Sequence, residues 1–239
     1  MWSHTRSLEL LVLVATVAPA ELVRVATAFG PAARAGTDPG RAARRAQLGA
    51  PSAYLLVTAL AVAVAADGGF VPDALTGRPA GAPWLLAAVG IGAALVGAEF
   101  ALGAAPAVLA GRGLPRLAVH PGAGPVGSGY AAAILLTAAA EEVLYRGLWI
   151  GLLHERLRLP AAIAVALAAL AYALGHLFFG GLAVVQKILS GAVFGLLAVV
   201  SGSLLVPLVA HLAQNGAVYA LAVRQQRAAR PARVPEAAG

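Results

Sequence analysis

Residues 130–153 read YAAAILLTAAAEEVLYRGLWIGLL, a long apolar segment with three charged side chains near its middle. A helix of this length, rising 1.5 Å per residue, crosses the ~30 Å hydrocarbon core of a bilayer. A glycine- and proline-containing loop at residues 111–127 precedes the segment, and the polar His154-Glu155-Arg156 follows it. We therefore expect a transmembrane helix with ionisable groups at membrane depth.

Apolar segments recur on both sides of this one. Of the 239 residues, 60% are hydrophobic and 11% charged, whereas soluble domains are about 25% charged. The sequence predicts an all-α, polytopic transmembrane helical bundle of about seven spans. Glycine pairs four residues apart, Gly147/Gly151 and Gly191/Gly195, favour close approach of helices. The other predicted spans are residues 8–29, 54–66, 84–110, 160–179, 182–200 and 204–223.

The first span resembles a secretory signal peptide as well as a retained helix. Arg6, the apolar run and Ala18-Pro19-Ala20 fit a cleaved signal. Glu9 at the edge of the apolar run favours a retained helix, so both readings stay open.

The net charge of +7 reflects arginines that lie between and beyond the apolar runs. Basic residues in such places set membrane orientation, and they predict no nucleic-acid partner. With the basic tail inside, most arginines fall on the inner side, so we expect a cytoplasmic C-terminus. The arginines on that side are Arg34, Arg41, Arg44, Arg45, Arg112, Arg116, Arg224, Arg227, Arg230 and Arg233. The absence of cysteine excludes disulfides, thiolate metal sites and a cysteine nucleophile.

The charged residues of the 130–153 segment are Glu141, Glu142 and Arg146. A charge at the centre of a membrane helix costs about 2.5–3.5 kcal/mol on insertion scales. Glu142 precedes Arg146 by four residues, which favours an intrahelical ion pair. Adjacent residues point about 100° apart, so the two glutamates should not face one target, and Glu141 is left available as a base. A Glu–Arg pair that only locks helix packing is the structural alternative.

Polar groups recur in the later spans. His176 lies near the end of the 160–179 span, while His211 and Asn215 are four residues apart and share one helix face. Hydrogen bonds between helices would explain each of them singly. Lys187 lies near a helix start, from which it can extend to the membrane surface. Together, a carboxylate, two imidazoles and an amide supply what is needed to activate water and stabilise an oxyanion.

The pattern Glu-Glu-x-x-x-Arg (141–146), aromatic-x-x-x-His (172–176) and His-x-x-x-Asn (211–215) resembles the CAAX-protease and bacteriocin-processing (CPBP, or Abi) family. That family is similar to the type II CAAX prenyl endopeptidases. The resemblance covers residues 127–223, and Tyr172 stands where phenylalanine is usual. It implies a catalytic core at 127–223, preceded by N-terminal transmembrane helices and loops at 1–126 and followed by a basic tail at 224–239.

The resemblance further implies an intramembrane endopeptidase in a bacterial-type plasma membrane, acting on a membrane-associated, possibly lipidated, peptide or protein. Glu141 and His176 would activate water, Glu142 with Arg146 would organise the site, and His211 with Asn215 would stabilise the oxyanion. A zinc-dependent version would use Glu141, His176 and His211 as ligands. No His-Glu-x-x-His helix is present, and Asn215 suits a hydrogen-bond donor better than a zinc ligand, so metal-free catalysis is favoured.

Two other classes of protein would also bury such residues. A transporter or proton relay uses ionisable groups in membrane helices, and a scaffold or immunity protein would act by binding alone. Peptide cleavage that depends on Glu141 separates the protease from both. The sequence leaves the substrate and the oligomeric state open.

Overall fold

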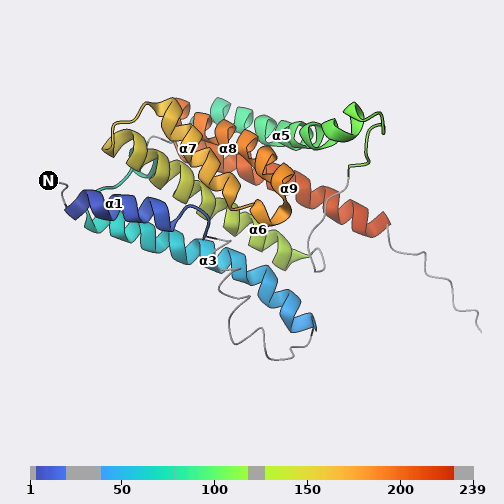
Figure 1. The fold of residues 1–239 in the computed structure, drawn as a ribbon, viewed down its shortest axis with the longest axis horizontal. Coiled ribbons are helices and arrows are strands. Elements are labelled where there is room, and N and C mark those ends of the chain that lie inside the picture. The colour runs from blue at the N-terminus through green and yellow to red at the C-terminus, as the bar shows by residue number, and fades with distance from the viewer. Residues whose placement is uncertain (1–3, 20–38, 78, 118–126, 229–239) are drawn as a thin grey trace, which may run out of the picture.

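The computed structural model describes residues 4–19, 39–77, 79–117 and 127–228 (Figure 1). Helices are the regular elements within these residues, which confirms the predicted all-α class. In chain order they are α1 (His4–Ala15), α3 (Pro39–Asp67), α4 (Asp73–Thr76), α5 (Ala82–Leu109), α6 (Ser128–Glu141), the π-helices η2 (Glu142–Trp149) and η3 (Gly151–Arg156), α7 (Ala161–Leu174), the 3₁₀-helix η4 (Leu177–Phe179), α8 (Gly181–Ser201) and α9 (Leu205–Ala228).

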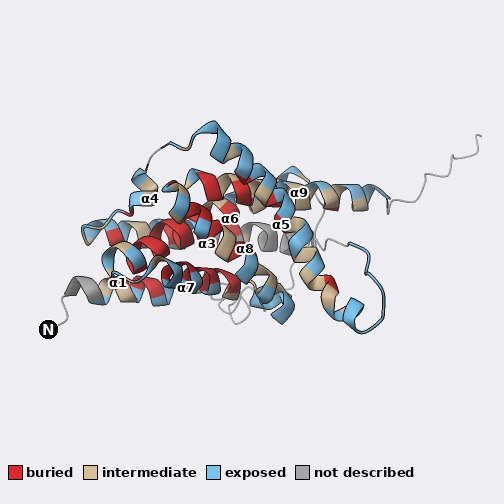
Figure 2. Ribbon diagram, turned by 90° about the horizontal axis from the view of Figure 1, so that it is seen from above, coloured by how far each residue is buried: buried red, intermediate tan, exposed pale blue. Residues whose placement is uncertain are grey.

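Three helices, α5, α8 and α9, are long and apolar enough to cross a membrane. Shorter apolar helical stretches are Pro51–Asp67 and α7. Large apolar side chains point outward from the bundle, including Leu86 of α5 and Val200 of α8. Figure 2 shows α5 largely exposed, while buried residues gather where α3 and α6 meet. This distribution suits an integral membrane protein, because lipid solvates an apolar exterior. The total number of spans and their orientation remain predictions.

The 130–153 segment is not one regular α-helix. The α-helical part ends at Glu141, and π-helical winding begins at Glu142. A π-helix is bonded from residue i to i+5, so its turns are wider than those of an α-helix. Thr58 of α3 donates a hydrogen bond to the carbonyl oxygen of Ala140 (3.4 Å), just before the winding changes. The change from α-helical to π-helical hydrogen bonding falls between the two glutamates. Short π-helical stretches within α-helices are frequent at functional sites.

Two other expected spans differ in extent. α7 ends at Leu174, so His176 lies in the turn between α7 and η4, not within a helix as expected. Gly175 follows the last residue of α7, and the His176 amide closes the turn onto the carbonyl of Ala173 (2.9 Å). α1 ends at Ala15. The expected 8–29 span is thus not one continuous helix, and its part from residue 20 lies outside the described residues.

The helices on either side of residues 118–126 pack against each other. α5 lies against α9 and α8, and α3 lies against α6 (Figure 1). α7 and α8 approach closely at two glycines, since a Cβ on Gly191 would meet Tyr172 at 3.0 Å and one on Gly195 would meet Val165 at 2.9 Å. Cβ atoms on Gly147 and Gly151 would meet Leu75 and Pro72. The predicted close approach of two helices is confirmed for Gly191/Gly195, whereas Gly147/Gly151 make room for the short α4 and the residues before it.

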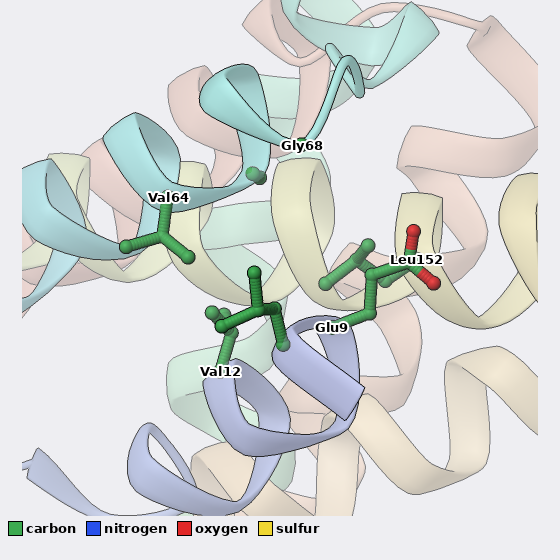
Figure 3. Close-up of a pocket in the computed structure, with 7 residues that line it drawn as sticks. Glu9, Val12, Val64, Gly68 and Leu152 are labelled. Carbon is green, nitrogen blue, oxygen red and sulfur yellow. The ribbon is translucent and has the colours of Figure 1, made fainter. Parts of the chain in front are cut away.

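The N-terminal helix α1 is fixed to the same bundle. Figure 3 shows Glu9 and Val12 of α1 beside Val64 of α3 and Leu152 of η3, around a small pocket. Glu9 Oε1 lies 2.6 Å from Arg156 Nε. These contacts hold α1 against η3.

Candidate active site

The Glu142–Arg146 pair lies within η2. Arg146 Nη1 is 3.2 Å from Glu142 Oε1, and both side chains are almost fully buried. Arg146 Nη2 also donates to the carbonyl of Gly191 in α8 (3.3 Å). The guanidinium carbon lies 4.4 Å from the centroid of the Tyr172 ring, a cation–π contact. The predicted ion pair is confirmed, and it connects η2 to both α7 and α8.

His211 of α9 lies between the two glutamates. Its Nδ1 is 2.7 Å from Glu142 Oε1, and its Nε2 is 3.9 Å from Glu141 Oε2. An ionised carboxylate only accepts hydrogen bonds, so beside an ionised Glu142 the imidazole must be the donor, through an N–H at Nδ1. This arrangement directs Nε2 toward Glu141. The Phe194 ring stacks on the imidazole with a centroid distance of 4.9 Å.

The expectation that the two glutamates could not face one target is therefore wrong. The backbone at both glutamates is regular right-handed helix, with φ −63° and ψ −40° at Glu141 and φ −65° and ψ −44° at Glu142, so the two side chains do leave the helix in different directions. The imidazole also presents its two nitrogens on different edges of the ring, so two carboxylates can approach it from different directions.

Tyr172 contacts both imidazoles. Its ring centroid lies 5.0 Å from that of His176 and 6.0 Å from that of His211. His176 Nδ1 is 3.2 Å from the carbonyl oxygen of Tyr172, and the His176 side chain is partly exposed. The aromatic residue of the second motif therefore links the turn at the end of α7 to the buried His211.

Asn215 faces the same helical segment as His211, as its spacing predicted. Asn215 Nδ2 donates to the carbonyl oxygen of Ile134 in α6 (3.3 Å). The other predicted site residues on α6 and η2 lie further along that segment, next to His211. Asn215 is thus one turn along α9 from His211, and its partner Ile134 lies seven residues before Glu141 on α6.

Sequence reasoning missed an ion pair beside this cluster. Lys187 Nζ of α8 lies 2.9 Å and 3.0 Å from the two carboxylate oxygens of Glu99 in α5. Gln186 Nε2 donates to the Glu99 carbonyl oxygen (2.6 Å). The predicted extension of Lys187 to the surface is thus replaced by a contact between helices. Glu99 could have indicated this pair from the sequence, because a carboxylate within the apolar residues 84–110 needs a partner on another helix.

A second missed feature is Gln214, which is fully buried one turn from His211. Neither its side-chain oxygen nor its nitrogen has a hydrogen-bond partner among the described residues, and the same holds for Ser190 Oγ and Glu142 Oε2. Buried polar atoms of this kind need solvent or a ligand to offset the lost hydration. The side chains near His211 therefore include buried polar atoms, those of Gln214 and Glu142, within a helical bundle that is mostly apolar.

A zinc-dependent enzyme would use Glu141, His176 and His211 as metal ligands. In the part of the chain that the structure describes, no three histidine, aspartate or glutamate side chains are grouped closely enough to hold a metal ion. His211 Nδ1 is also engaged by Glu142. The described arrangement does not fit a preformed three-ligand zinc site.

An apolar groove lies between α3 and the segment formed by the end of α6 and the start of η2. Its walls are Leu55, Thr58, Ala59, Val62, Ala63 and Ala66 on one side and Ala139, Ala140 and Val143 on the other. The groove is open to the exterior of the bundle. An apolar chain that moves from the bilayer into this groove exchanges lipid contacts for apolar protein contacts, so the transfer has little hydrophobic cost.

Comparison with known proteins places the three motifs in a recognised family segment. Residues 126–217 match the model of the type II CAAX prenyl endopeptidase Rce1-like family. This match confirms the resemblance inferred from the motifs, all of which lie within it, and it spans less than half of the chain. No curated protein and no solved structure matches the chain significantly.

Proposed function

We propose, from the match of residues 126–217 to the Rce1-like family, that this protein is an intramembrane endopeptidase of the CAAX type. The family is one of proteases, which supports peptidase activity for the matched segment. One observation carries the proposal to this chain's own residues: the buried series Glu141, His211, Glu142 and Arg146, held by contacts of 3.9, 2.7 and 3.2 Å. Such a series is costly in a membrane and needs a functional reason.

In the proposed mechanism, Glu141 is the general base. It takes a proton from water, with His176 assisting, and the resulting hydroxide attacks the carbonyl carbon of the scissile peptide. The tetrahedral oxyanion accepts hydrogen bonds from His211 Nε2–H and from Asn215 Nδ2–H. Glu141 then passes its proton to the leaving amine as the C–N bond breaks.

Glu142 and Arg146 have a supporting role in this scheme. To donate from Nε2 while Nδ1 is bonded to Glu142, the His211 imidazole needs a proton on both nitrogens during the reaction, and the Glu142 carboxylate 2.7 Å from Nδ1 stabilises that cationic form. Arg146 in turn offsets the Glu142 charge and anchors it to α8 through the Gly191 carbonyl. The site thus holds an oxyanion-stabilising donor within low-dielectric surroundings, where such donors act most strongly.

The α3–α6 groove supports a substrate that reaches the site from the bilayer. Its lining is almost wholly apolar and continues to Ala140, the neighbour of Glu141. A hydrophobic or lipidated segment of the substrate would lie in this groove while the peptide enters the polar site. This is the substrate class that we propose.

The test is cleavage by the purified protein in liposomes that contain membrane-anchored and lipidated peptides. Glu141→Gln, His176→Ala and His211→Ala should each lower the rate by about 10²- to 10⁴-fold. The exposed Arg112→Gln serves as a control that should keep full activity. Equal cleavage by wild type and Glu141→Gln would contradict the proposal. Ion or solute flux that depends on Glu141 without any cleavage would favour a transporter.

A further inference from the structure

Tyr54 of α3 reaches into the candidate site from outside the family match. The side chain is 2% exposed and lies one turn before Thr58, which bonds to Ala140. Its hydroxyl lies beside the Glu141 carboxyl and the Tyr145 hydroxyl. A helix that carries none of the three motifs therefore contributes a polar group next to the proposed base.

The same hydroxyl lies against the turn that carries His176. A Cβ on Gly175 would stand 2.6 Å from Tyr54 Oη, closer than real Cβ atoms approach other atoms. Glycine at position 175 thus leaves room for the hydroxyl. Because Gly175 immediately precedes His176, the Tyr54 hydroxyl is set between Glu141 and the His176 turn.

The hydroxyl has a proton to donate at this point. Tyr54 Oη is buried and completes no hydrogen bond with any described group. The Tyr145 hydroxyl is already directed to the carbonyl of Val17 (3.3 Å). Of its two polar neighbours, Glu141 in its ionised form is the stronger acceptor, since hydrogen bonds to charged groups are roughly twice as strong as neutral ones.

We propose that Tyr54 is a positioning residue of the active site, whose hydroxyl donates to Glu141 and holds the carboxylate between His211 and the His176 turn. The proposal rests on the proposed function, because it assigns Glu141 the role of base. It extends the functional site to α3, outside the 126–217 segment. It also gives a reason for glycine at position 175.

Kinetics of Tyr54→Phe form the first test, since this change removes only the hydroxyl. We expect kcat to fall about tenfold, as for the loss of one hydrogen bond to a charged group. KM and the unfolding midpoint in detergent should stay at wild-type values. Tyr130→Phe is the matched control, because Tyr130 stacks on Tyr219 at the other end of α6, and it should leave kcat unchanged. An unchanged kcat in Tyr54→Phe, or a fall in kcat that merely follows lost stability, would overturn the proposal.

The contact with Gly175 gives a second test that needs no activity. Gly175→Ala should lower the unfolding midpoint, because the new Cβ meets Tyr54 Oη. Adding Tyr54→Phe should restore most of the loss, since it removes the obstructing oxygen. If the double variant is as unstable as Gly175→Ala alone, the hydroxyl does not occupy this position and the proposal fails.

Infrared spectroscopy separates this proposal from the proposed function. The Glu141 carboxylate band is identified as the difference between wild type and Glu141→Gln, and it should shift in Tyr54→Phe but not in Tyr130→Phe. If wild type cleaves no peptide, the protease assignment fails while the shift still supports the Tyr54–Glu141 contact. A band that does not move in Tyr54→Phe contradicts the contact whether or not the protein cleaves.

Discussion

His211 Nδ1 and Arg146 Nη1 both lie close to one oxygen atom, Oε1 of Glu142: the imidazole nitrogen is hydrogen-bonded to it at 2.7 Å, and the guanidinium nitrogen forms an ion pair with it at 3.2 Å. One carboxylate oxygen thereby connects α9 to η2, because it contacts both the Arg146 guanidinium and the His211 imidazole. Breaking a buried pair from one side leaves an uncompensated charge, which costs more than removing both partners. This relationship makes Glu142 the most sensitive point of the cluster.

The Glu142–Arg146 pair can be tested by a double-mutant cycle. Glu142→Gln and Arg146→Met should each lower the free energy of unfolding by about 3–5 kcal/mol, because each leaves a buried charge unpaired. The double variant should lose clearly less than the sum of the two. Reversible unfolding in detergent measures all four proteins, with Arg112→Gln as an exposed control. Simple additivity would contradict the coupling.

The Glu99–Lys187 pair predicts a similar but smaller coupling between α5 and α8. Glu99→Gln alone leaves a partly buried lysine and should cost about 1.5–3 kcal/mol. Glu99→Gln with Lys187→Gln should recover part of that loss, because no charge then remains unpaired. Unfolding midpoints at low and high salt measure the effect. Equal stability of wild type and Glu99→Gln would show that the pair contributes nothing.

Gly92 controls how closely α5 approaches the His211 turn of α9. A Cβ on Gly92 would collide with the carbonyl oxygen of Ala210, the residue before His211. Gly92→Ala should therefore destabilise by about 1–3 kcal/mol through overpacking and lower activity by displacing His211. Gly90 is the matched control on the same helix, since nothing lies within 4 Å of its Cβ position. Gly90→Ala should be neutral or stabilise by up to about 1 kcal/mol. The two variants behaving alike would refute the close contact.

Metal removal distinguishes the two versions of the chemistry. We expect cleavage to persist after dialysis against a strong chelator, with metal content checked by mass spectrometry. A zinc enzyme would instead lose activity and regain it when zinc is added back. That result would reassign Glu141, His176 and His211 as ligands.

Sequence reasoning identified the helical class, the Glu142–Arg146 pair and the face shared by His211 and Asn215. Each of these follows from spacing along one helix, which local periodicity determines. It placed His176 inside a helix, because it extended the apolar run of α7 through Gly175. It placed the two glutamates on separate targets, because spacing along one helix does not show that a single imidazole from another helix meets both carboxylates through its two nitrogens. The π-helix at Glu142 and the early end of α7 lie next to Thr58 and Tyr54, two residues that are distant in sequence and whose contacts no local pattern predicts.

The amino-acid sequence by itself determined that this chain is a bundle of apolar helices with a small set of ionisable side chains at membrane depth. It determined this because hydrophobicity and helical period are properties of consecutive residues. Only the tertiary structure decided that His211 meets both glutamates, that Glu99 pairs with Lys187 and that Tyr54 lies against Gly175. Those contacts join residues on separate segments of the chain. Their distances depend on how closely the helices pack, which small residues at the helix interfaces determine.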